Sequence, residues 1–270
     1  MNEAVELRAS VIIVMHNDAQ HIERCLNAVL AQTLPADAYE VIAVDNASTD
    51  GTRELAARYA PAVRLLPLDA NYGFAGGNNR GARLARGEWL VFLNSDTEVE
   101  PDWLGMLLAV AEAHPDVVAL HAAQIYPWAQ RAGDSESRLL ISDVCRWGFV
   151  RYYPVQRDDL PIPTLFVSGA TAMARRAWLA EAGDPFDETF FMYAEDRDLG
   201  LRANAQGWRV LAVPAAVARH YQRNALEDPR KAWRTARLAA RNGWRAYLKN
   251  MYLTEFLLYA PFVCLGALLK

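Results

Sequence analysis

The chain contains 270 residues, 53% of them hydrophobic, and carries a formal net charge of −4. This composition excludes an intrinsically disordered chain and suits one large domain, or one domain with appendages. The charge is uneven, because residues 230–270 contain eight Lys and Arg against one acidic residue, which leaves −11 for the remainder. An acidic body argues against nucleic acid as a partner, whereas the basic end indicates a local anionic partner.

The three cysteines, Cys25, Cys145 and Cys264, are widely spaced. They suggest neither a disulfide framework nor a zinc site, so we expect a reducing compartment. The first ten residues include acids and no long apolar run, and they therefore predict no signal peptide. Together these features indicate a cytoplasmic protein.

Short apolar runs alternate with amphipathic segments, a pattern typical of an α/β fold with a parallel, doubly wound sheet. The runs predict strands at 10–15, 39–44, 63–68, 89–93, 117–125, 164–168 and 208–213, the third of them edge-like because Pro67 interrupts it. The amphipathic segments predict helices at 18–32 with Asp18 as cap, 53–59 after a turn at 48–52, about 79–85, 101–113, 175–182 and 195–207.

Residues 126–162 mix Pro, Gly, charged and aromatic residues without a clear period, so we expect an irregular or partly helical insertion. Gly169 is predicted to allow a close approach between backbone segments. We assign residues 1–222 to the α/β domain, with a mostly parallel central sheet flanked by helices, and residues 223–270 to a helical C-terminal tail.

The sequence WLVFLNSDTE, residues 89–98, begins as a strand buried on both faces and then reaches Asn94, Ser95 and Asp96. Open α/β sheets bind ligands at the carboxyl ends of their strands. Mg²⁺ is commonly shared between one or two protein carboxylates and substrate phosphates. Asp96 therefore either anchors a metal–diphosphate or belongs to a polar turn before the next helix, and this segment alone favours neither.

Asp45 and Asn46 end the second predicted strand on the same rim of the sheet. Asp45 could accept the imide N–H of uracil or thymine, although these two residues alone favour a turn-forming Asx pair. The glycine-rich segment 71–79 is predicted to be a loop that opens a helix, where free N–H groups can meet an anion. Arg80 and Arg83 lie just behind it and could meet phosphate, but solvated surface is the better interpretation of Arg83.

A second acidic group, Glu195, Asp196 and Asp198, opens a predicted helix beside several aromatic residues. Acids in a first helical turn are favoured by the helix dipole alone, so an ordinary cap is one interpretation. The other is that Asp196 is a general base for an attacking hydroxyl, with Glu195 and Asp198 beside it. His220 could be a metal or phosphate ligand, although most single histidines are neither.

Six motifs, in this order, resemble the inverting family-two glycosyltransferases of the GT-A fold, and most closely their rhamnosyltransferase-like branch. The resemblance covers roughly residues 10–222. The motifs are SVIIVMHN (10–17), VDNASTDGT (44–52), NYGFAGGNNRGA (71–82), LNSDTEV (93–99), SGATAMARR (168–176) and FDETFFMYAEDRDLGLR (186–202), followed by His220.

The resemblance implies transfer of a sugar, with inversion at the anomeric carbon, from a UDP- or dTDP-sugar to a hydroxyl of a glycan or lipid-linked acceptor. Thymidine-diphosphate rhamnose is the first candidate donor, and galactofuranose and N-acetylglucosamine remain open. Asp45 would read the pyrimidine base. The nucleotide-binding set that the resemblance implies is Asp45, Asn46, Asn17, Gly76, Asn79, Asn94 and Ser95.

The resemblance also implies a metal site and a catalytic base. The segment 94–96 corresponds to the metal-binding Asp-x-Asp motif, so Asp96 would hold Mg²⁺ or Mn²⁺ with His220 near it. Asp196 would be the catalytic base, preceded by Glu195 in the Glu-Asp motif. Asn94 stands where the motif has its first acid, which leaves fewer charged ligands and predicts weak metal binding without nucleotide.

Two adjacent stripes run along one predicted helix of the tail. The basic stripe is Arg230, Arg234, Arg237, Arg241, Arg245 and Lys249, and the apolar stripe is Trp233, Ala236, Ala240, Trp244, Tyr247 and Met251. This combination suits peripheral attachment to an anionic membrane surface, on its cytoplasmic side, and packing on the domain or on a second copy in a homo-oligomer is the alternative. Residues 256–269 are apolar but shorter than the ~20 residues that span a bilayer.

Two other classes of protein remain open. A sugar nucleotidyltransferase would want a glycine-rich loop with a basic residue directly after the first strand, and residues 15–18, MHND, offer none. A catalytically silent scaffold that binds sugar nucleotides is the second class, and the presence of both Asp96 and Asp196 argues against it.

Overall fold

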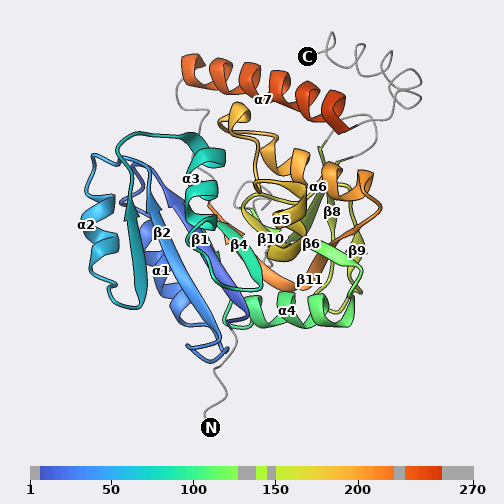
Figure 1. The fold of residues 1–270 in the computed structure, drawn as a ribbon, viewed down its shortest axis with the longest axis horizontal. Helices are drawn as coiled ribbons and strands as arrows, with labels where there is room; N and C mark the ends of the chain where they lie inside the picture. Colours follow the sequence, from blue (N-terminus) through green and yellow to red (C-terminus); the bar gives the residue numbers. More distant parts are fainter. Residues whose placement is uncertain (1–6, 127–137, 145–149, 222–228, 251–270) are drawn as a thin grey trace.

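The computed structural model describes residues 7–126, 138–144, 150–221 and 229–250, which form a mixed β-sheet with helices on both faces (Figure 1). The strands are β1 (Ala9–Met15), β2 (Tyr39–Asp45), β3 (Val63–Pro67), β4 (Trp89–Asn94), β5 (Thr97–Val99), β6 (Val117–Ile125), β7 (Leu139–Val144), β8 (Val150–Pro154), β9 (Ile162–Pro163), β10 (Thr171–Arg175) and β11 (Arg209–His220). The helices are α1 (Ile22–Leu30), α2 (Thr52–Ala57), α3 (Gly73–Ala82), α4 (Trp103–Ala113), α5 (Arg176–Ala182), the 3₁₀ helix η2 (Glu188–Phe190), α6 (Glu195–Ala205) and α7 (Pro229–Asn250).

The amino-terminal half of the sheet is parallel, because short apolar strands are connected there by helices. β2 and β4 both pair in parallel with β1, and β3 extends the sheet beyond β2 as an edge strand. The register places Met15 opposite Asp45 and Val14 opposite Asn94, so β1, β2 and β4 end at one rim. The predicted α/β class, with a central sheet flanked by helices, is confirmed.

An antiparallel strand divides the sheet. β10 lies between β4 and β6 and is antiparallel to both, whereas β11 is parallel to β6. Thr171, the first residue of β10, is opposite Leu93 near the end of β4. The turn that precedes β10 and contains Gly169 therefore lies at the rim where β4 ends. The sheet is thus mixed, in the order β3-β2-β1-β4-β10-β6-β11-β5.

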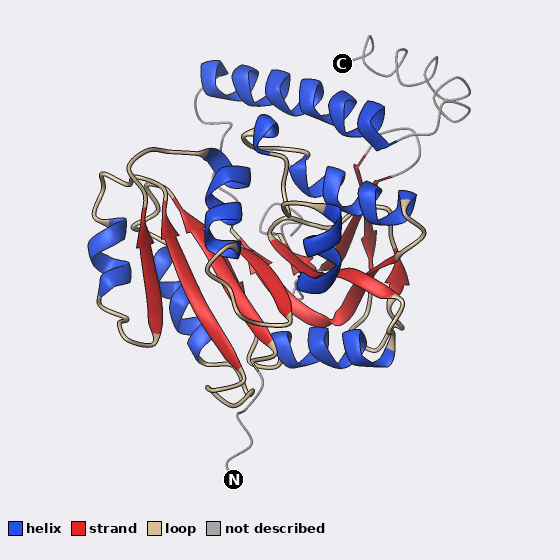
Figure 2. Cartoon of the chain, viewed as in Figure 1, coloured by secondary structure: helices blue, strands red, loops and turns tan. Residues whose placement is uncertain are grey.

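Two apolar layers form the core, one on each face of the sheet. Figure 2 shows in blue the helices that cover these faces. α1 and α4 contribute Leu26 and Trp103 to the first layer, and both side chains are fully buried. α3, α5 and α6 contribute Ala75, Trp178 and Leu199 to the second layer. α7 packs against α6 on the outside of this second layer (Figure 1).

Two predictions for the carboxyl half are wrong. The described part of the 126–162 insertion forms strands, because β7 pairs with β6 and continues into a hairpin with β8. Residues 164–168 are not a strand, since side chains satisfy part of their backbone: Asp143 accepts from the Leu165 N–H, and the Thr164 hydroxyl donates to the carbonyl of Phe166. Strand β10 begins only after the turn that follows.

The glycine-rich segment is mostly helical rather than a loop, since α3 begins at Gly73. Two of its glycines face the sheet: a Cβ on Gly77 would lie 2.8 Å from Val14 Cγ1, and one on Gly81 would lie 2.5 Å from Ile12 Cγ2. These two glycines therefore let α3 pack closely onto β1. This contact explains Gly77 and Gly81 without a bound ligand.

Replacing Gly81 with Ala should destabilise the fold by about 1–3 kcal/mol, the usual cost of overpacking a close contact. Gly105, in α4, is the matched control, because a Cβ there would meet nothing of the described chain within 4 Å. Gly105→Ala should stabilise the fold by about 0.5–1 kcal/mol through reduced backbone entropy of the unfolded chain. Urea unfolding of both variants measures the two effects, and a stabilising Gly81→Ala would show that the contact with Ile12 is not restrictive.

Candidate active site

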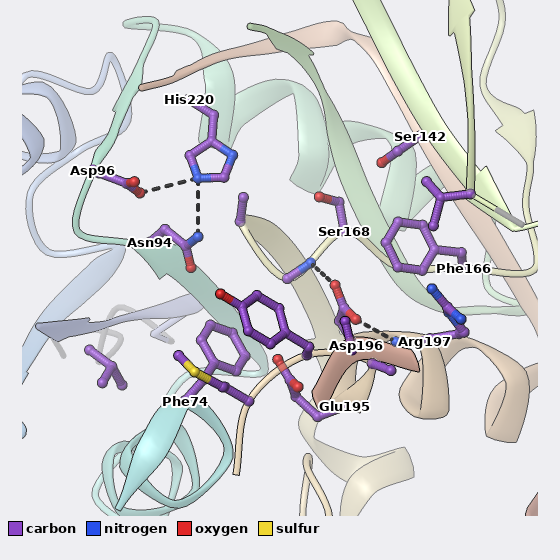
Figure 3. Close-up of a pocket in the computed structure, with 18 of the residues that line it drawn as sticks. Phe74, Asn94, Asp96, Ser142, Phe166, Ser168, Glu195, Asp196, Arg197 and His220 are labelled. Carbon is purple, nitrogen blue, oxygen red and sulfur yellow. Dashed lines mark hydrogen bonds and ion pairs between the residues drawn. The ribbon is translucent and has the colours of Figure 1, made fainter. Parts of the chain in front are cut away.

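Six of the residues predicted from the sequence line one open cavity of about 620 Å³ at the rim of the sheet (Figure 3). Its volume is in the range of about 300–1,000 Å³ that is typical of small-molecule sites. The residues come from the turn after β4, the end of β11 and the start of α6, which are far apart in the sequence. They are Asn94, Ser95, Asp96, Glu195, Asp196 and His220.

His220 reaches Asp96 because β11 continues beyond its predicted end at Val213. The strand has an irregularity after Val213, runs on to His220, and its last residues pair with β5 directly after Asp96. His220 Nε2 lies 3.2 Å from Asp96 Oδ1 and 3.2 Å from the side-chain nitrogen of Asn94. The sheet itself therefore brings together the two residues predicted to lie at a metal.

This pair fits a divalent cation whose coordination is completed by a ligand. Among the described residues, no group of three or more His, Cys, Asp or Glu side chains is arranged to hold a metal ion. One carboxylate and one imidazole can still hold Mg²⁺ or Mn²⁺ when phosphates and water supply the other positions. That a metal binds weakly without nucleotide stays a prediction.

Two backbone N–H groups hold the carboxylate of Asp196 at the cavity wall (Figure 3). Gly169 N donates to Asp196 Oδ2 at 3.0 Å, and Arg197 N donates to Oδ1 at 2.8 Å. A Cβ on Gly169 would lie 3.1 Å from Asp196 Cβ, so the close approach predicted at Gly169 is confirmed. Burial raises the pKa of Asp196 above its ordinary value, while the hydrogen bond from Gly169 acts in the opposite direction.

Glu195 is more deeply buried than Asp196. Its side chain packs into the protein, and Oε2 accepts no hydrogen bond from the described residues. Burial raises the pKa of Glu195 well above its usual range, and the charge of Asp196 raises it further. Because two neighbouring carboxyl groups do not both ionise readily, the more deeply buried Glu195 is the harder of the two to ionise.

Five other predicted residues lie outside the cavity lining: Asp45, Asn46, Asn17, Gly76 and Asn79. The carboxylate of Asp45 is fully buried and accepts hydrogen bonds from Arg53 Nε at 2.6 Å and from Ser48 N at 3.1 Å. These bonds match the turn-forming interpretation of Asp45. Recognition of the pyrimidine base of the donor by Asp45 stays a prediction.

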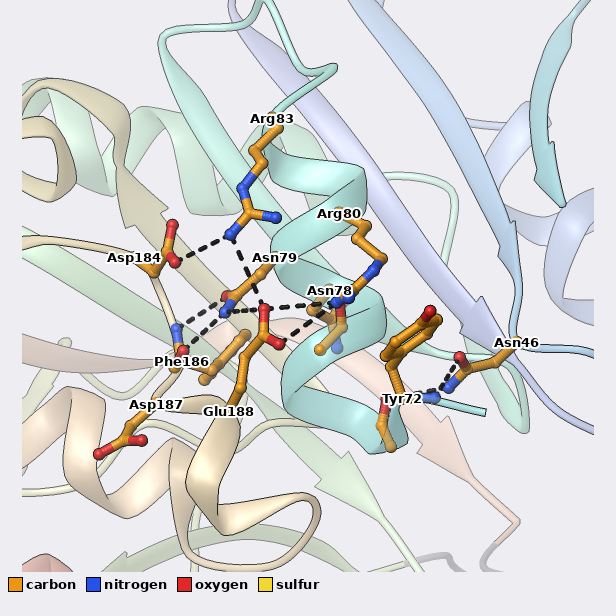
Figure 4. Close-up of polar contacts among 12 residues, drawn as sticks. Asn46, Tyr72, Asn78, Asn79, Arg80, Arg83, Asp184, Phe186, Asp187 and Glu188 are labelled. Atoms are coloured by element: carbon orange, nitrogen blue, oxygen red, sulfur yellow. Dashed lines mark hydrogen bonds and ion pairs between the residues drawn. The ribbon is translucent and has the colours of Figure 1, made fainter. Parts of the chain in front are cut away.

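Asn46 and Asn79 fix the position of α3 (Figure 4). Asn46 Nδ2 donates to the carbonyl of Gly73 at 2.9 Å, and Asn46 Oδ1 accepts from Tyr72 N at 2.9 Å. Asn79 makes a two-way pair with the backbone of Phe186, at 2.7 and 3.1 Å. Both amides therefore have structural partners at the start and on the flank of this helix.

Asn17 and Gly76 are also accounted for by local packing. Asn17 Oδ1 accepts from Thr49 N at 2.7 Å, and Gly76 lies within α3. The predicted cap of the first helix is wrong, because α1 begins at Ile22 without a side-chain cap. The carboxylate of Asp18 instead accepts a hydrogen bond from the hydroxyl of Ser95 and thereby ties the two rim turns together.

Arg80 and Arg83 point toward the segment before α6 rather than into the cavity lining (Figure 4). Arg80 pairs with Glu188 at 3.3 Å and lies over the ring of Tyr72. Arg83 pairs with Asp184 at 3.0 Å and is more than half exposed. The structure thus agrees with the surface interpretation of Arg83.

One wall of the cavity is aromatic, and none of its residues is among the site residues predicted from the sequence. Tyr126, Tyr152 and Phe166 line this wall, and the rings of the two tyrosines are 5.5 Å apart. Thr235 and Ala239 of α7 line the cavity as well. The sequence signal for this wall is the insertion at 126–162, where aromatic residues occur without a clear period, and it does not specify which residues line a site.

This fold, with carboxylates gathered at its rim, is that of the GT-A glycosyltransferases. The profile of Glycosyl transferase family 2 matches residues 10–183, and the chain belongs to that family. It is 30% identical over 243 residues to the N-acetylglucosaminyl-diphospho-decaprenol L-rhamnosyltransferase of Mycobacterium tuberculosis, covering 81% of this chain and 78% of that protein. It is 27% identical over 233 residues to the validoxylamine A glucosyltransferase of Streptomyces hygroscopicus, covering 78% of this chain and 53% of that protein.

Solved structures of glycosyltransferases share the fold. The mannosyltransferase PcManGT of Pyrobaculum calidifontis, in complex with GDP-Man and Mn²⁺, has a TM-score of 0.68 at 22% identity and covers 95% of this chain and 69% of that one. TarS of S. aureus has a TM-score of 0.62 at 20% identity. The match covers 86% of this chain but spans only 39% of TarS. The predicted family, fold and rhamnosyltransferase-like resemblance are therefore confirmed.

Replacing Glu195 with Gln should stabilise the protein at pH 8. A carboxyl group whose pKa is raised by folding binds more protons in the folded state, so stability falls as the pH rises above the unfolded pKa of about 4.3. The neutral amide removes that loss, and each ~1 kcal/mol gained would raise Tm by about 2–4 °C in a protein of this size. The gain should shrink as the pH is lowered toward 4.

Thermal unfolding between pH 4 and pH 8 measures this effect. Glu54→Gln is the control, because it makes the same chemical change at an exposed position. A Glu195→Gln variant that is no more stable than the wild type at pH 8 would contradict the inferred loss of stability caused by the buried carboxyl group.

Proposed function

We propose that the protein is an inverting glycosyltransferase in which Asp196 is the general base and Asp96 with His220 holds a divalent cation. One observation carries this proposal: a single cavity is lined on one side by the Asp96–His220 pair and on another by the carboxylate of Asp196. Transfer with inversion requires such an arrangement, since the leaving group and the attacking hydroxyl occupy opposite faces of the sugar.

The chain's own residues then act in defined ways. The carboxylate of Asp196 takes the proton of an acceptor hydroxyl, whose oxygen attacks the anomeric carbon while the bond from that carbon to the diphosphate oxygen breaks. The N–H groups of Gly169 and Arg197 hold the carboxylate in place during this transfer. A bound Mg²⁺ or Mn²⁺ would supply Lewis-acid neutralisation of the departing diphosphate.

The donor and acceptor are proposed from the relatives. The Mycobacterium tuberculosis relative is named for transfer of L-rhamnose to a diphospho-decaprenol-linked sugar, and we propose thymidine-diphosphate rhamnose and a lipid-linked saccharide for this chain. Solved neighbours hold UDP-GlcNAc or GDP-Man, so uridine and guanosine donors belong in any test. The aromatic wall of Tyr126 and Tyr152 provides an apolar surface on which an acceptor sugar ring could stack.

Asp96→Ala and Asp196→Asn should separate donor binding from turnover. Asp96→Ala should lose metal-dependent donor binding, whereas Asp196→Asn should bind donor normally and lose roughly 10²–10⁴-fold in kcat, the usual contribution of a general base. Calorimetry with uridine-, thymidine- and guanosine-diphosphate sugars, with Mg²⁺ or Mn²⁺ and with chelator, measures the first effect. Product formation measures the second.

Two results would contradict these roles. Equal loss of donor binding in both variants would remove the distinction between metal ligand and base. A wild-type protein that binds a donor but transfers nothing to any acceptor would favour the silent scaffold. Membership of a glycosyltransferase family leaves the nucleotidyltransferase without support.

The C-terminal helix presents a basic and aromatic surface away from the domain. Trp233 is 64% exposed and Leu248 is 57% exposed, and Arg237 and Arg241 are exposed near them. We propose that this face of α7 binds an anionic bilayer, which suits a lipid-linked acceptor.

Within the described ranges, no helix is both long enough and apolar enough to cross a membrane. The apolar residues 256–269 lie outside the described residues.

Flotation with anionic vesicles tests this surface. The double variant Trp233→Ala/Arg237→Gln should bind at least about fivefold more weakly, since one Arg near an anionic surface contributes ~1 kcal/mol. The matched control is Trp208→Ala/Arg209→Gln, an exposed Trp and Arg at the other end of β11 from His220, which should bind like the wild type. A wild-type protein that does not float with anionic vesicles would contradict membrane attachment.

A further inference from the structure

The five residues that precede the Glu195–Asp196 pair form a strained segment, residues 190–194, which we call the strap. Its backbone has positive φ at three residues other than glycine: 64° at Phe191, 69° at Tyr193 and 70° at Ala194. Each such residue costs of order 1–3 kcal/mol and persists only where the surroundings enforce it. The strap therefore requires partners that hold it.

Helix α3 holds the strap from one side. The N–H of Ala75, free for an outside partner because it lies in the first turn of α3, donates to the carbonyl of Phe191 at 3.2 Å. Gly73 has φ of +71°, and a Cβ there would lie 2.2 Å from the Phe191 carbonyl oxygen. The glycine that opens α3 is thus required for the contact between this helix and the strap.

Asn242 of α7 holds the strap from the other side. Its side chain is fully buried, and Nδ2 lies 2.8 Å, 2.9 Å and 3.1 Å from the carbonyl oxygens of Phe190, Met192 and Tyr193. Two amide hydrogens serve these three acceptors, so one is shared. Asn242 Oδ1 accepts from Arg241 at 3.0 and 3.1 Å, which fixes the orientation of the amide.

Neighbouring contacts dock α7 at the same place. Ala246 is buried in a small cluster with Phe190 and Ala194 of the strap. One turn further along, Lys249 and Asn250 donate to the buried carboxylate of Asp198 in the first turn of α6, at 3.0 Å and 2.8 Å. The helix is therefore bound to both the strap and the helix that carries Asp196.

We propose that Asn242 is a positioning residue for catalysis, which acts by holding the strap so that Asp196 meets Gly169 and faces the cavity. This inference rests on the proposed role of Asp196, since Asn242 itself does not line the cavity. The role requires a neutral side chain with two N–H donors. A carboxylate at position 242 would place negative charge against three carbonyl oxygens, and an aliphatic side chain would remove the Asn242 donor from all three of them.

Asn242→Leu, of similar size, should lower kcat roughly ten- to a hundredfold, because a displacement of about 1 Å in a reacting group can cost about 10²-fold. The Kd for the nucleotide sugar found by calorimetry should stay within about twofold, since Asp96 and His220 are held by β5 and β11. Hydrogen–deuterium exchange of the strap should become faster. Asn242→Ser, which is too short to reach three carbonyls, should give the same pattern if the leucine variant does not fold.

Asn204→Leu is the matched control. Asn204 also donates its amide to backbone carbonyls, those of Gly200 and Thr164, but lies at the far end of α6 from the strap. It should lose stability without faster exchange in the strap or a selective loss of kcat. Unchanged kcat and strap exchange in folded Asn242 variants would overturn the proposal, as would a parallel loss of kcat and donor affinity.

Hydrogen–deuterium exchange in the strap is measured without substrate. It therefore tests the role of Asn242 separately from the proposed transferase function. Faster strap exchange in Asn242→Leu together with a wild type that transfers no sugar would mean that Asn242 holds the strap but that the proposed transferase function is wrong. Normal transfer by the wild type and by Asn242→Leu would mean that the function stands and the positioning role does not.

Discussion

The candidate active site depends on burying two adjacent carboxyl groups, Glu195 and Asp196, at the start of α6. Burial of a carboxylate without partners is costly, and the neighbouring charge increases the cost. The protein offsets it with the N-terminal end of a helix dipole and with the N–H groups of Gly169 and Arg197. The strap, whose backbone is left-handed at three residues, leads directly into this pair. The packing of α3 and α7 around the strap is therefore part of the electrostatics of the site.

The mixed sheet explains why the partners of Asp196 and Asp96 come from distant parts of the chain. An antiparallel β10 begins where β4 ends, which brings Gly169 to the rim beside Asn94. β11 then runs parallel to β6 beyond an irregularity, far enough for its last residue, His220, to pair next to Asp96. In an all-parallel sheet the segment before a strand would lie at the opposite edge, so Gly169 could not serve this site.

Much of the fold, and six of the residues that line the cavity, could be predicted because the relevant signals are local. Apolar runs that are buried on both faces identify strands, and polar residues at their ends identify the rim. The prediction failed where long-range contacts decide the conformation. The glycines of α3 resemble a ligand-binding loop in sequence, yet the small size of Gly77 and Gly81 serves packing on β1. Residues 164–168 resemble a strand because Phe166 and Val167 are apolar, but they are buried in a connection.

Helix α7 is a second case in which hydrophobic periodicity alone does not identify the face that docks on the domain. The predicted apolar stripe divides in the structure, because Tyr247 is buried in an apolar cluster of the domain whereas Trp233 is exposed. The face that docks on the domain also carries Asn242, Ala246 and Asn250. Amides suit this face because the surface below presents backbone carbonyls and a carboxylate beside its apolar side chains. This docking leaves Trp233 exposed. One helix can thus hold the strap with one face while its other face is available to an anionic surface. The predicted boundary at residue 222 lies between α6 and α7, which pack against each other in the structure.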